Sequence, residues 1–144
     1  MQELRDRYIK LNGLCAVDTQ RLINTQSELG LTFPESFYEA CKFFDGSGCG
    51  NFFHNIDRAV EPNIFGETQR LRESISLPNR YLVIGEPPGS LLLIDCEIGS
   101  TIWCDASDAP NLAKGGPLRD PTIWNNFYEC LEFAIEQEEE ESKF

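Results

Sequence analysis

The chain has 144 residues, which is enough for one domain with its own hydrophobic core. Its 12 Lys and Arg face 24 Asp and Glu, and the net charge of −12 argues against nucleic acid and anionic membranes as partners. No run of about 18 apolar residues could span a membrane, and the charged N-terminus lacks the apolar segment of a secretory signal. We therefore expect a cytoplasmic protein.

The first half of the chain predicts four helices, over residues 2–11, 18–29, 34–44 and 64–75. Asp18 is a suitable N-cap, and Gly30 stands where glycine ends a helix. Pro34 fits the first turn of the third helix, where its missing N–H costs nothing, and Gly46 ends that helix. A short strand is expected over residues 51–56.

Three strands follow, over residues 81–84, 91–95 and 101–104, and they predict an antiparallel meander. Gly85 closes the first strand, Gly89 lies in the turn after it, and Gly99 lies in the next turn. Asp95 ends the second strand, where we expect a turn or cap role. The nearly continuous apolar character of the middle strand indicates that helices cover much of the sheet.

Residues 106–121 predict a loop, because proline and glycine recur there. Thr122 is the predicted N-cap of the last helix. The apolar stripe of that helix consists of Ile123, Phe127, Cys130, Leu131, Ala134 and Ile135. The tail over residues 136–144 holds five glutamates, which repel one another at the negative end of the helix dipole, so we expect it to fray.

The cysteines and the single histidine predict no metal site and no cofactor. The six cysteines show no C-x-x-C spacing, and a zinc site needs close ligand pairs. Disulfides are not expected in a cytoplasmic domain, although Cys96 and Cys104 could face each other across a hairpin. Cys41 and Cys130 fall on apolar helix stripes and are expected to act as small hydrophobic residues.

Catalytic motifs are not evident, and we expect a protein that is not an enzyme. His54 follows two phenylalanines, which favours a strand-surface or partly buried role. The glycine-rich run over residues 46–50 lacks the lysine of a phosphate-binding loop and is interpreted as a helix exit. Asp95 and Asp105 could form a carboxylate pair on neighbouring strands, as a hydrolase would need, but turn or cap roles are expected.

A protein-binding surface is the preferred interpretation of the acidic second half. Residues 1–73 hold 11 acids and 8 bases, whereas residues 74–144 hold 13 acids and 4 bases, so the second half carries −9 of the net charge. Such a surface attracts a basic partner, although solubility alone would also explain it. An aromatic anchor inside an acidic rim would consist of Trp103 with Glu86, Glu97, Asp105 and Asp108; a core position for Trp103 is the alternative.

Short motifs follow one another in a fixed order along most of the chain. They are Leu29-Gly30, Phe33-Pro34, the aromatic helix up to Phe44, Asp45-Gly46, Ile84-Gly85, Gly89, Ile94-Asp95, Gly99, Trp103 to Asp105, and Phe127 to Phe133. In this order the chain resembles the SUKH superfamily in its Smi/Knr branch. That branch includes bacterial toxin-immunity proteins and a yeast cell-wall-synthesis regulator. Phe33 replaces the more usual leucine, and the loop over 106–121 is long.

The resemblance implies an α+β fold, in which one domain over residues 1–144 packs an antiparallel meander against helices. It also implies a non-catalytic immunity protein that binds a cognate toxin domain, of which a basic nuclease is one class. A regulatory interaction adaptor is the alternative. The oligomeric state is left open.

Overall fold

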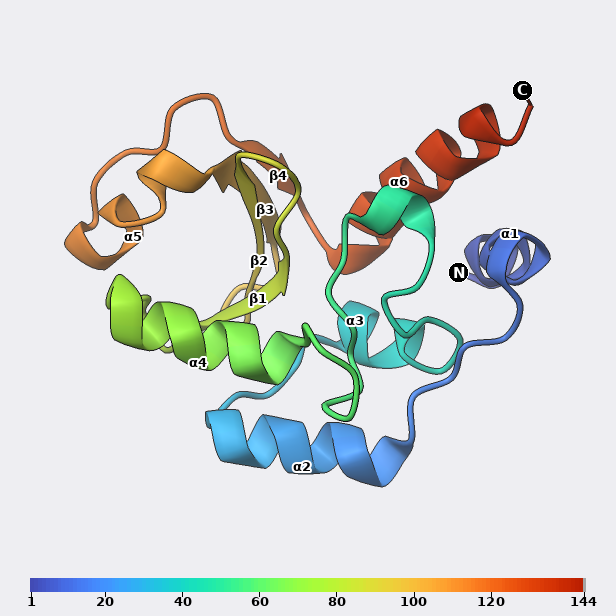
Figure 1. Ribbon diagram of the computed structural model, residues 1–144, viewed down its shortest axis with the longest axis horizontal. Coiled ribbons are helices and arrows are strands. Elements are labelled where there is room, and N and C mark those ends of the chain that lie inside the picture. Colours follow the sequence, from blue (N-terminus) through green and yellow to red (C-terminus); the bar gives the residue numbers. More distant parts are fainter. Residues whose placement is uncertain (144) are drawn as a thin grey trace.

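The computed structural model describes residues 1–143 and has a four-stranded antiparallel sheet at its centre (Figure 1). The strands lie in the order of the chain: β1 (Tyr81–Gly85), β2 (Ser90–Asp95), β3 (Thr101–Asp105) and β4 (Thr122–Trp124). The helices are α1 (Gln2–Asn12), α2 (Thr19–Leu29), α3 (Glu35–Ala40), α4 (Ile64–Ser74), α5 (Asn111–Lys114) and α6 (Phe127–Glu141). The predicted α+β fold and its meander are confirmed.

Helices cover both faces of the sheet, which explains why β1 and β2 are apolar without alternation. Successive side chains of a strand point to opposite faces. Leu82 and Ile84 therefore join the larger core, which α1, α2, α3 and α6 complete. Val83 joins a smaller core with Leu71 of α4 and Ala109 of the segment after β3. Figure 1 shows α4 and α5 on one side of the sheet and α3 and α6 on the other.

Aromatic rings fill the larger core. The ring of Phe127, at the start of α6, lies 5.0 Å from that of Phe37 and 5.8 Å from that of Phe53, measured between centroids. Phe44 packs edge-on against Phe53 at 5.0 Å. Edge-to-face contacts of this kind stabilise a core beyond the area that they bury. This cluster joins the N-terminal helices to α6 and to the sheet.

The predicted ends of the second helix and the predicted start of the third helix are confirmed, because short-range chemistry determines them. Asp18 accepts a hydrogen bond from the Arg21 N–H, and Gly30 adopts φ +69° as the C-cap of α2. Pro34 is the N-cap residue of α3. A side chain at Gly85 would place Cβ 2.0 Å from the carbonyl oxygen of Phe52, so only glycine fits between these two backbone segments.

Four predictions about local structure are wrong. The third helix ends at Ala40 and does not reach residue 44 before Gly46, because residues 41–43 continue as turns. Residues 51–56 form no strand, because a 3₁₀ turn (Cys49–Asn51) with positive φ at Cys49 and Asn51 bends the chain there. Thr122 caps no helix: it begins strand β4, and Asn126 caps α6 through the Glu129 N–H. The segment over residues 106–121 contains a 3₁₀ turn (Ala106–Asp108) and α5, as well as loop.

The acidic tail, for which the sequence predicts fraying, is helical up to Glu141 in the structure, and Phe144 lies outside the described residues. Two contacts from α1 stabilise it. Arg7 forms a bidentate ion pair with Glu139, and the Asn12 amide donates to Glu138 at 2.8 Å. Tertiary contacts thus outweigh the repulsion among the glutamates.

Candidate protein-binding surface

Trp103 lies at the surface of the larger core, half-buried, and not inside it. Its ring centroid is 5.3 Å from that of Phe52 and 6.2 Å from that of Phe133 on α6. Trp124 of β4 packs on the other side of Phe133, at 5.7 Å. Four partly buried aromatic side chains from four separate segments therefore meet where the sheet edge contacts α6.

The strand register explains this meeting. Trp103 pairs with Thr122, and Thr101 pairs with Trp124, so residues 101, 103, 122 and 124 all face α6. Trp103, Thr122, Trp124 and Phe133 line a cavity of about 240 Å³, which we call the aromatic hollow. β4 is an edge strand of three residues, and Thr122 is exposed, so the hollow is open to a partner.

Acidic side chains surround the aromatic hollow. On α6, Glu129, Glu136 and Glu140 stand four residues before and three and seven residues after Phe133, so they share its face of the helix, and all three are exposed. Asp105 and Asp120 line an adjacent shallow cavity of about 520 Å³ together with Trp103 and Arg119. Hydrogen bonds from Ser107 lower the pKa of Asp105, so this carboxylate is charged at neutral pH.

Of the five residues predicted to bind a partner, the structure brings Trp103 and Asp105 together and separates the other three. Glu97 lies in the turn after β2, at the opposite end of β3 from Asp105, and pairs with Arg80 at 3.0 Å. Asp108 is 3% exposed and accepts hydrogen bonds from the backbone and side chain of Arg119, so its place on an acidic rim is corrected to a structural one. Glu86 belongs to a separate cluster near α4.

Asp95 and Asp105 do not form a carboxylate pair. Asp95 is opposite Tyr81 and Asp105 is opposite Ser90, at the two ends of the sheet. Asp95 is buried, forms two hydrogen bonds with Arg80, and accepts the Glu97 N–H of the following turn. It therefore has the turn role that the sequence predicts.

Trp124, Phe133 and the glutamates of α6 are the residues that sequence analysis missed at this surface. The cause lies at Thr122, where the sequence predicts the N-cap of a helix and the structure has the start of β4. Pro121 before it, Asn125 and Asn126 after it, and the alternation of Thr122 with Trp124 are signals of a short strand. A strand of three residues has too short an alternating pattern to outweigh the prediction of Thr122 as a helix N-cap.

The cysteines do not form a second site. All six are free within residues 1–143, and Cys104 pairs in register with Leu91 while Cys96 follows the far end of β2, so the two do not face each other. Burial raises the pKa of the Cys104 thiol to about 11 and that of Cys96 to about 12. Cys41 and Cys130 are buried, as expected of small hydrophobic residues.

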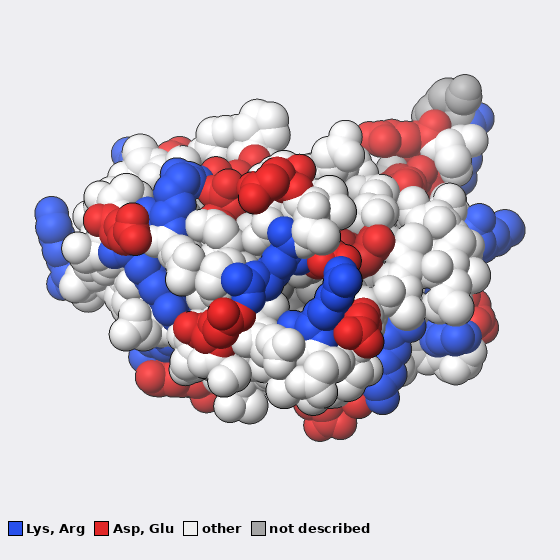
Figure 2. All heavy atoms as spheres, turned by 60° about the horizontal axis from the view of Figure 1, so that its bottom comes forward, with Lys and Arg blue, Asp and Glu red and all other residues white. Residues whose placement is uncertain are grey.

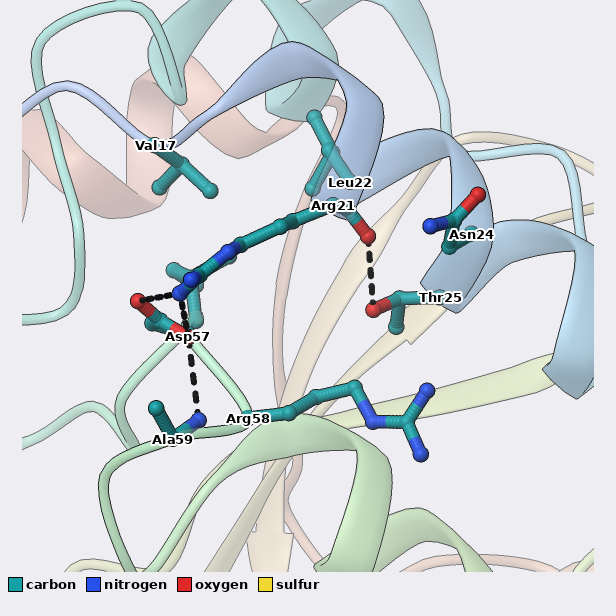
Figure 3. A pocket seen from close by; sticks show the side chains of 9 residues that line it. Val17, Arg21, Leu22, Asn24, Thr25, Asp57, Arg58 and Ala59 are labelled. Atoms are coloured by element: carbon teal, nitrogen blue, oxygen red, sulfur yellow. Dashed lines mark hydrogen bonds and ion pairs between the residues drawn. The ribbon is translucent and has the colours of Figure 1, made fainter.

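A third cavity, of about 360 Å³, lies between α2 and the loop over residues 56–59 (Figure 3). Its arginines already have anionic partners: Arg21 contacts Asp57 at 2.9 Å, and Arg58 pairs with Glu28. Figure 2 shows the same alternation of basic and acidic side chains across the face that carries α2 and α4. Charge is largely balanced there, which contrasts with the excess of glutamate along α6.

Comparisons with known proteins concern the fold. No protein-family model matches the chain, and no curated protein matches it. The crystal structure of a protein from Pseudomonas syringae pv. tomato is similar, with a TM-score of 0.67 over 89% of this chain and 92% of that chain. The two sequences are 13% identical, so the likeness shows the fold alone. Each helix within residues 1–143 is too short or too polar to cross a membrane.

Proposed function

We propose that this chain is a non-catalytic immunity protein, which binds a cognate toxin domain in the cytoplasm of the producing cell and occludes its active site. The observation that carries the proposal is the aromatic hollow with its acidic rim. The ordered motifs that resemble the SUKH superfamily support the same function. A basic nuclease domain is the toxin class that fits this surface best, because the glutamates and aspartates would take the place of the phosphate backbone.

The two parts of the surface have different roles in this proposal. Trp103, Trp124 and Phe133 supply rigid aromatic area around a cavity, and such side chains contribute most of the binding energy at protein interfaces. Glu136 and Glu140 lie along the helix beside them and attract a basic domain, which raises the association rate more than it slows dissociation. The acidic rim therefore predicts a binding rate that falls steeply with salt.

The test uses the C-terminal domain of the protein encoded immediately upstream of this chain's gene. That domain is expressed in cells with and without this chain, and growth is measured. We expect the domain to stop growth alone and the wild-type chain to restore it. A domain that is harmless, or toxicity that this chain does not relieve, contradicts the proposal and favours the regulatory adaptor.

Matched variants assign the interface. Thr122→Arg places a large cation in the hollow, whereas Ile123→Arg changes the next residue of the same strand, which is 59% exposed on the opposite face of the sheet. We expect the first variant to abolish rescue and the second to retain it.

With purified proteins, Glu136→Lys should slow association and flatten its salt dependence, while Glu73→Lys, the same charge change on α4, should not. Equal effects of the paired variants would contradict this interface.

A further inference from the structure

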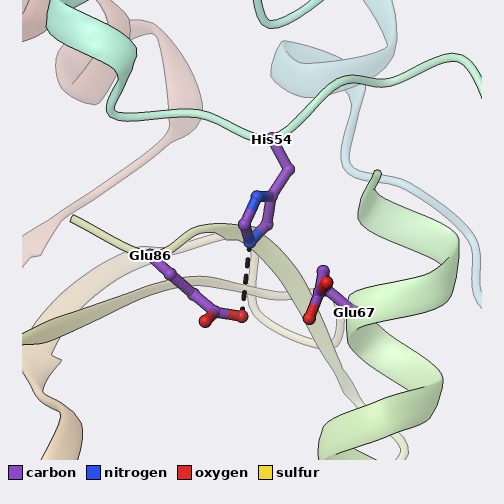
Figure 4. Close-up of side chains that lie close together, drawn as sticks. All are labelled: His54, Glu67 and Glu86. Carbon is purple, nitrogen blue, oxygen red and sulfur yellow. Dashed lines mark ion pairs between the residues drawn. The ribbon is translucent and has the colours of Figure 1, made fainter. Parts of the chain in front are cut away.

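Three side chains with metal-binding atoms meet beside β1, at the opposite edge of the sheet from the aromatic hollow. His54 comes from the segment before α4, Glu67 from the first turn of α4, and Glu86 from the residue after β1 (Figure 4). One potential ligand atom from each lies within 4.8 Å of the other two. They are far apart in the sequence, so no spacing motif predicts this cluster.

His54 is the most enclosed side chain of the cluster, and it faces Glu86. Its side chain is 11% exposed, and its Nε2 atom is buried without a hydrogen-bond partner, 3.3 Å from the Glu86 Oε1 atom. This contact is an ion pair when the imidazole is protonated, and a metal cation between the two atoms would supply the same positive charge. The His54 backbone N–H donates to the Ile84 carbonyl oxygen at 2.8 Å, which anchors this residue beside β1.

Arg70 supplies a positive charge to the two carboxylates. Its Nε lies 2.5 Å from Glu67 Oε2, and its Nη2 lies 2.6 Å from Glu86 Oε1. The arginine side chain is half exposed, so it can swing into solvent on its flexible stem. It bridges the two carboxylates and shares Glu86 Oε1 with His54 Nε2, which makes no hydrogen bond of its own.

We propose that His54, Glu67 and Glu86 bind a divalent transition-metal cation of the Zn²⁺ class, in competition with Arg70. Metal–ligand bonds of about 2.0–2.2 Å place neighbouring ligand atoms about 3.3–3.5 Å apart. His54 and Glu86 already have that separation, and Glu67, within 4.8 Å of both, needs to move by at most about 1.5 Å. One imidazole with two carboxylates suits Zn²⁺ or Co²⁺ better than Mg²⁺ or Ca²⁺.

The surroundings leave room for further coordination. His54 and Glu86 line a cavity of about 540 Å³ with Gly46, Gly48 and Asn51. A side chain at Gly46 would place Cβ 2.2 Å from the His54 carbonyl oxygen, so glycine at this position lets the two segments approach. Three protein ligands with an open side allow water to complete a tetrahedral shell.

The test is titration of the purified, reduced full chain with Co²⁺ and with Zn²⁺. Calorimetry measures the binding of both metals, and visible absorption measures bound Co²⁺. We expect one site with nitrogen and oxygen ligands and no thiolate charge-transfer band. His54→Gln and Glu67→Gln should each weaken binding by about tenfold or more, and Glu73→Gln, on the same helix, should not. Arg70→Gln should tighten binding because it removes the competing cation, whereas Arg72→Gln should leave it unchanged.

Because His54 is the only histidine, its ring signals in NMR spectra of the wild type report binding without any variant. We expect these signals to shift, or to broaden with Co²⁺, at one equivalent of metal. Unchanged ring signals would overturn the proposal. So would binding that alkylation of the cysteines abolishes, or equal Co²⁺ affinity of the wild type and His54→Gln.

Discussion

Arg7 connects the acidic end of α6 to α1, and its replacement should release that end. Its Nε and Nη2 donate to the two carboxylate oxygens of Glu139 at 3.1 and 2.6 Å, and its Nη1 lies 3.6 Å from Glu132. Arg7→Met keeps the aliphatic stem and removes these contacts. We expect the last turns of α6 to open, because its consecutive glutamates then repel one another without compensation.

The side-chain exposures limit the size of this effect. Arg7 is 24% and Glu139 36% exposed, so solvent screens the pair and its bidentate contact contributes on the order of 1 kcal/mol. The restored repulsion adds a few tenths of a kcal/mol. We therefore expect Arg7→Met to lower the free energy of unfolding by about 1–1.5 kcal/mol in low salt, and by less in high salt, where both terms are screened.

The effect should also depend on pH. Hydrogen bonding to Arg7 lowers the pKa of Glu139 in the folded protein. A lowered folded-state pKa means that the stabilisation is complete above the unfolded pKa of glutamate and is lost as the pH falls through the folded value. The difference in stability between wild type and Arg7→Met should therefore be full at neutral pH and small in acid below the lowered pKa.

Urea denaturation and amide hydrogen exchange measure these effects. Arg7→Met should accelerate exchange of the amides of residues 139–142 and leave those of β2 protected. Arg5→Met is the matched control, since Arg5 lies on the same helix and contacts only Asp6, at 3.9 Å, among the acids of residues 1–143. Equal stability of the two variants, with unchanged exchange at the end of α6, would refute the reasoning.

Three further predictions concern the core and the thiols. Gly85→Ala should cost about 3 kcal/mol in urea denaturation, because its Cβ would meet backbone, whereas Gly66→Ala in α4 meets nothing closer than 3.5 Å and should be neutral or stabilising. Phe127→Ala should cost about 3–5 kcal/mol by the same measurement, since its ring is fully buried; a loss below 1 kcal/mol would show that the aromatic cluster repacks. A thiol reagent at mildly alkaline pH should modify Cys15 first in the native protein, and it should modify all six cysteines only after unfolding. The reason is that the other five thiols are more deeply buried, which raises their pKa and blocks access of the reagent. Rapid reaction of Cys41 in the native protein would contradict its buried placement.

Local chemistry allowed much of the fold to be predicted. The caps at Asp18 and Gly30 depend on neighbours within a few residues, and the turns at Gly89 and Gly99 depend on positive φ values that glycine tolerates. The three long strands of the meander carry enough β-rich sequence to be recognised. The turn role of Asp95 could also be predicted, because its carboxylate accepts the N–H of Glu97, only two residues further along the chain.

The candidate sites could not be predicted in the same way. The sequence predicts Trp103 as an aromatic anchor, but Trp124 and Phe133 meet it only through strand register and the position of α6. The fold buries Asp108 beside Arg119, whereas Glu97 stays exposed and pairs with Arg80. Sequence distance carries no information about such pairs.

The sequence by itself determined the α+β class, the helix starts in the first half, the meander and the acidic character, because each depends on composition or on contacts between near neighbours. Tertiary structure alone decided that Thr122–Trp124 is a strand, that the glutamate-rich tail is helical, and that His54, Glu67 and Glu86 meet. The physical reason is common to all three. Contacts between distant segments, such as Arg7 with Glu139, outweigh local preferences of a few tenths of a kcal/mol per residue.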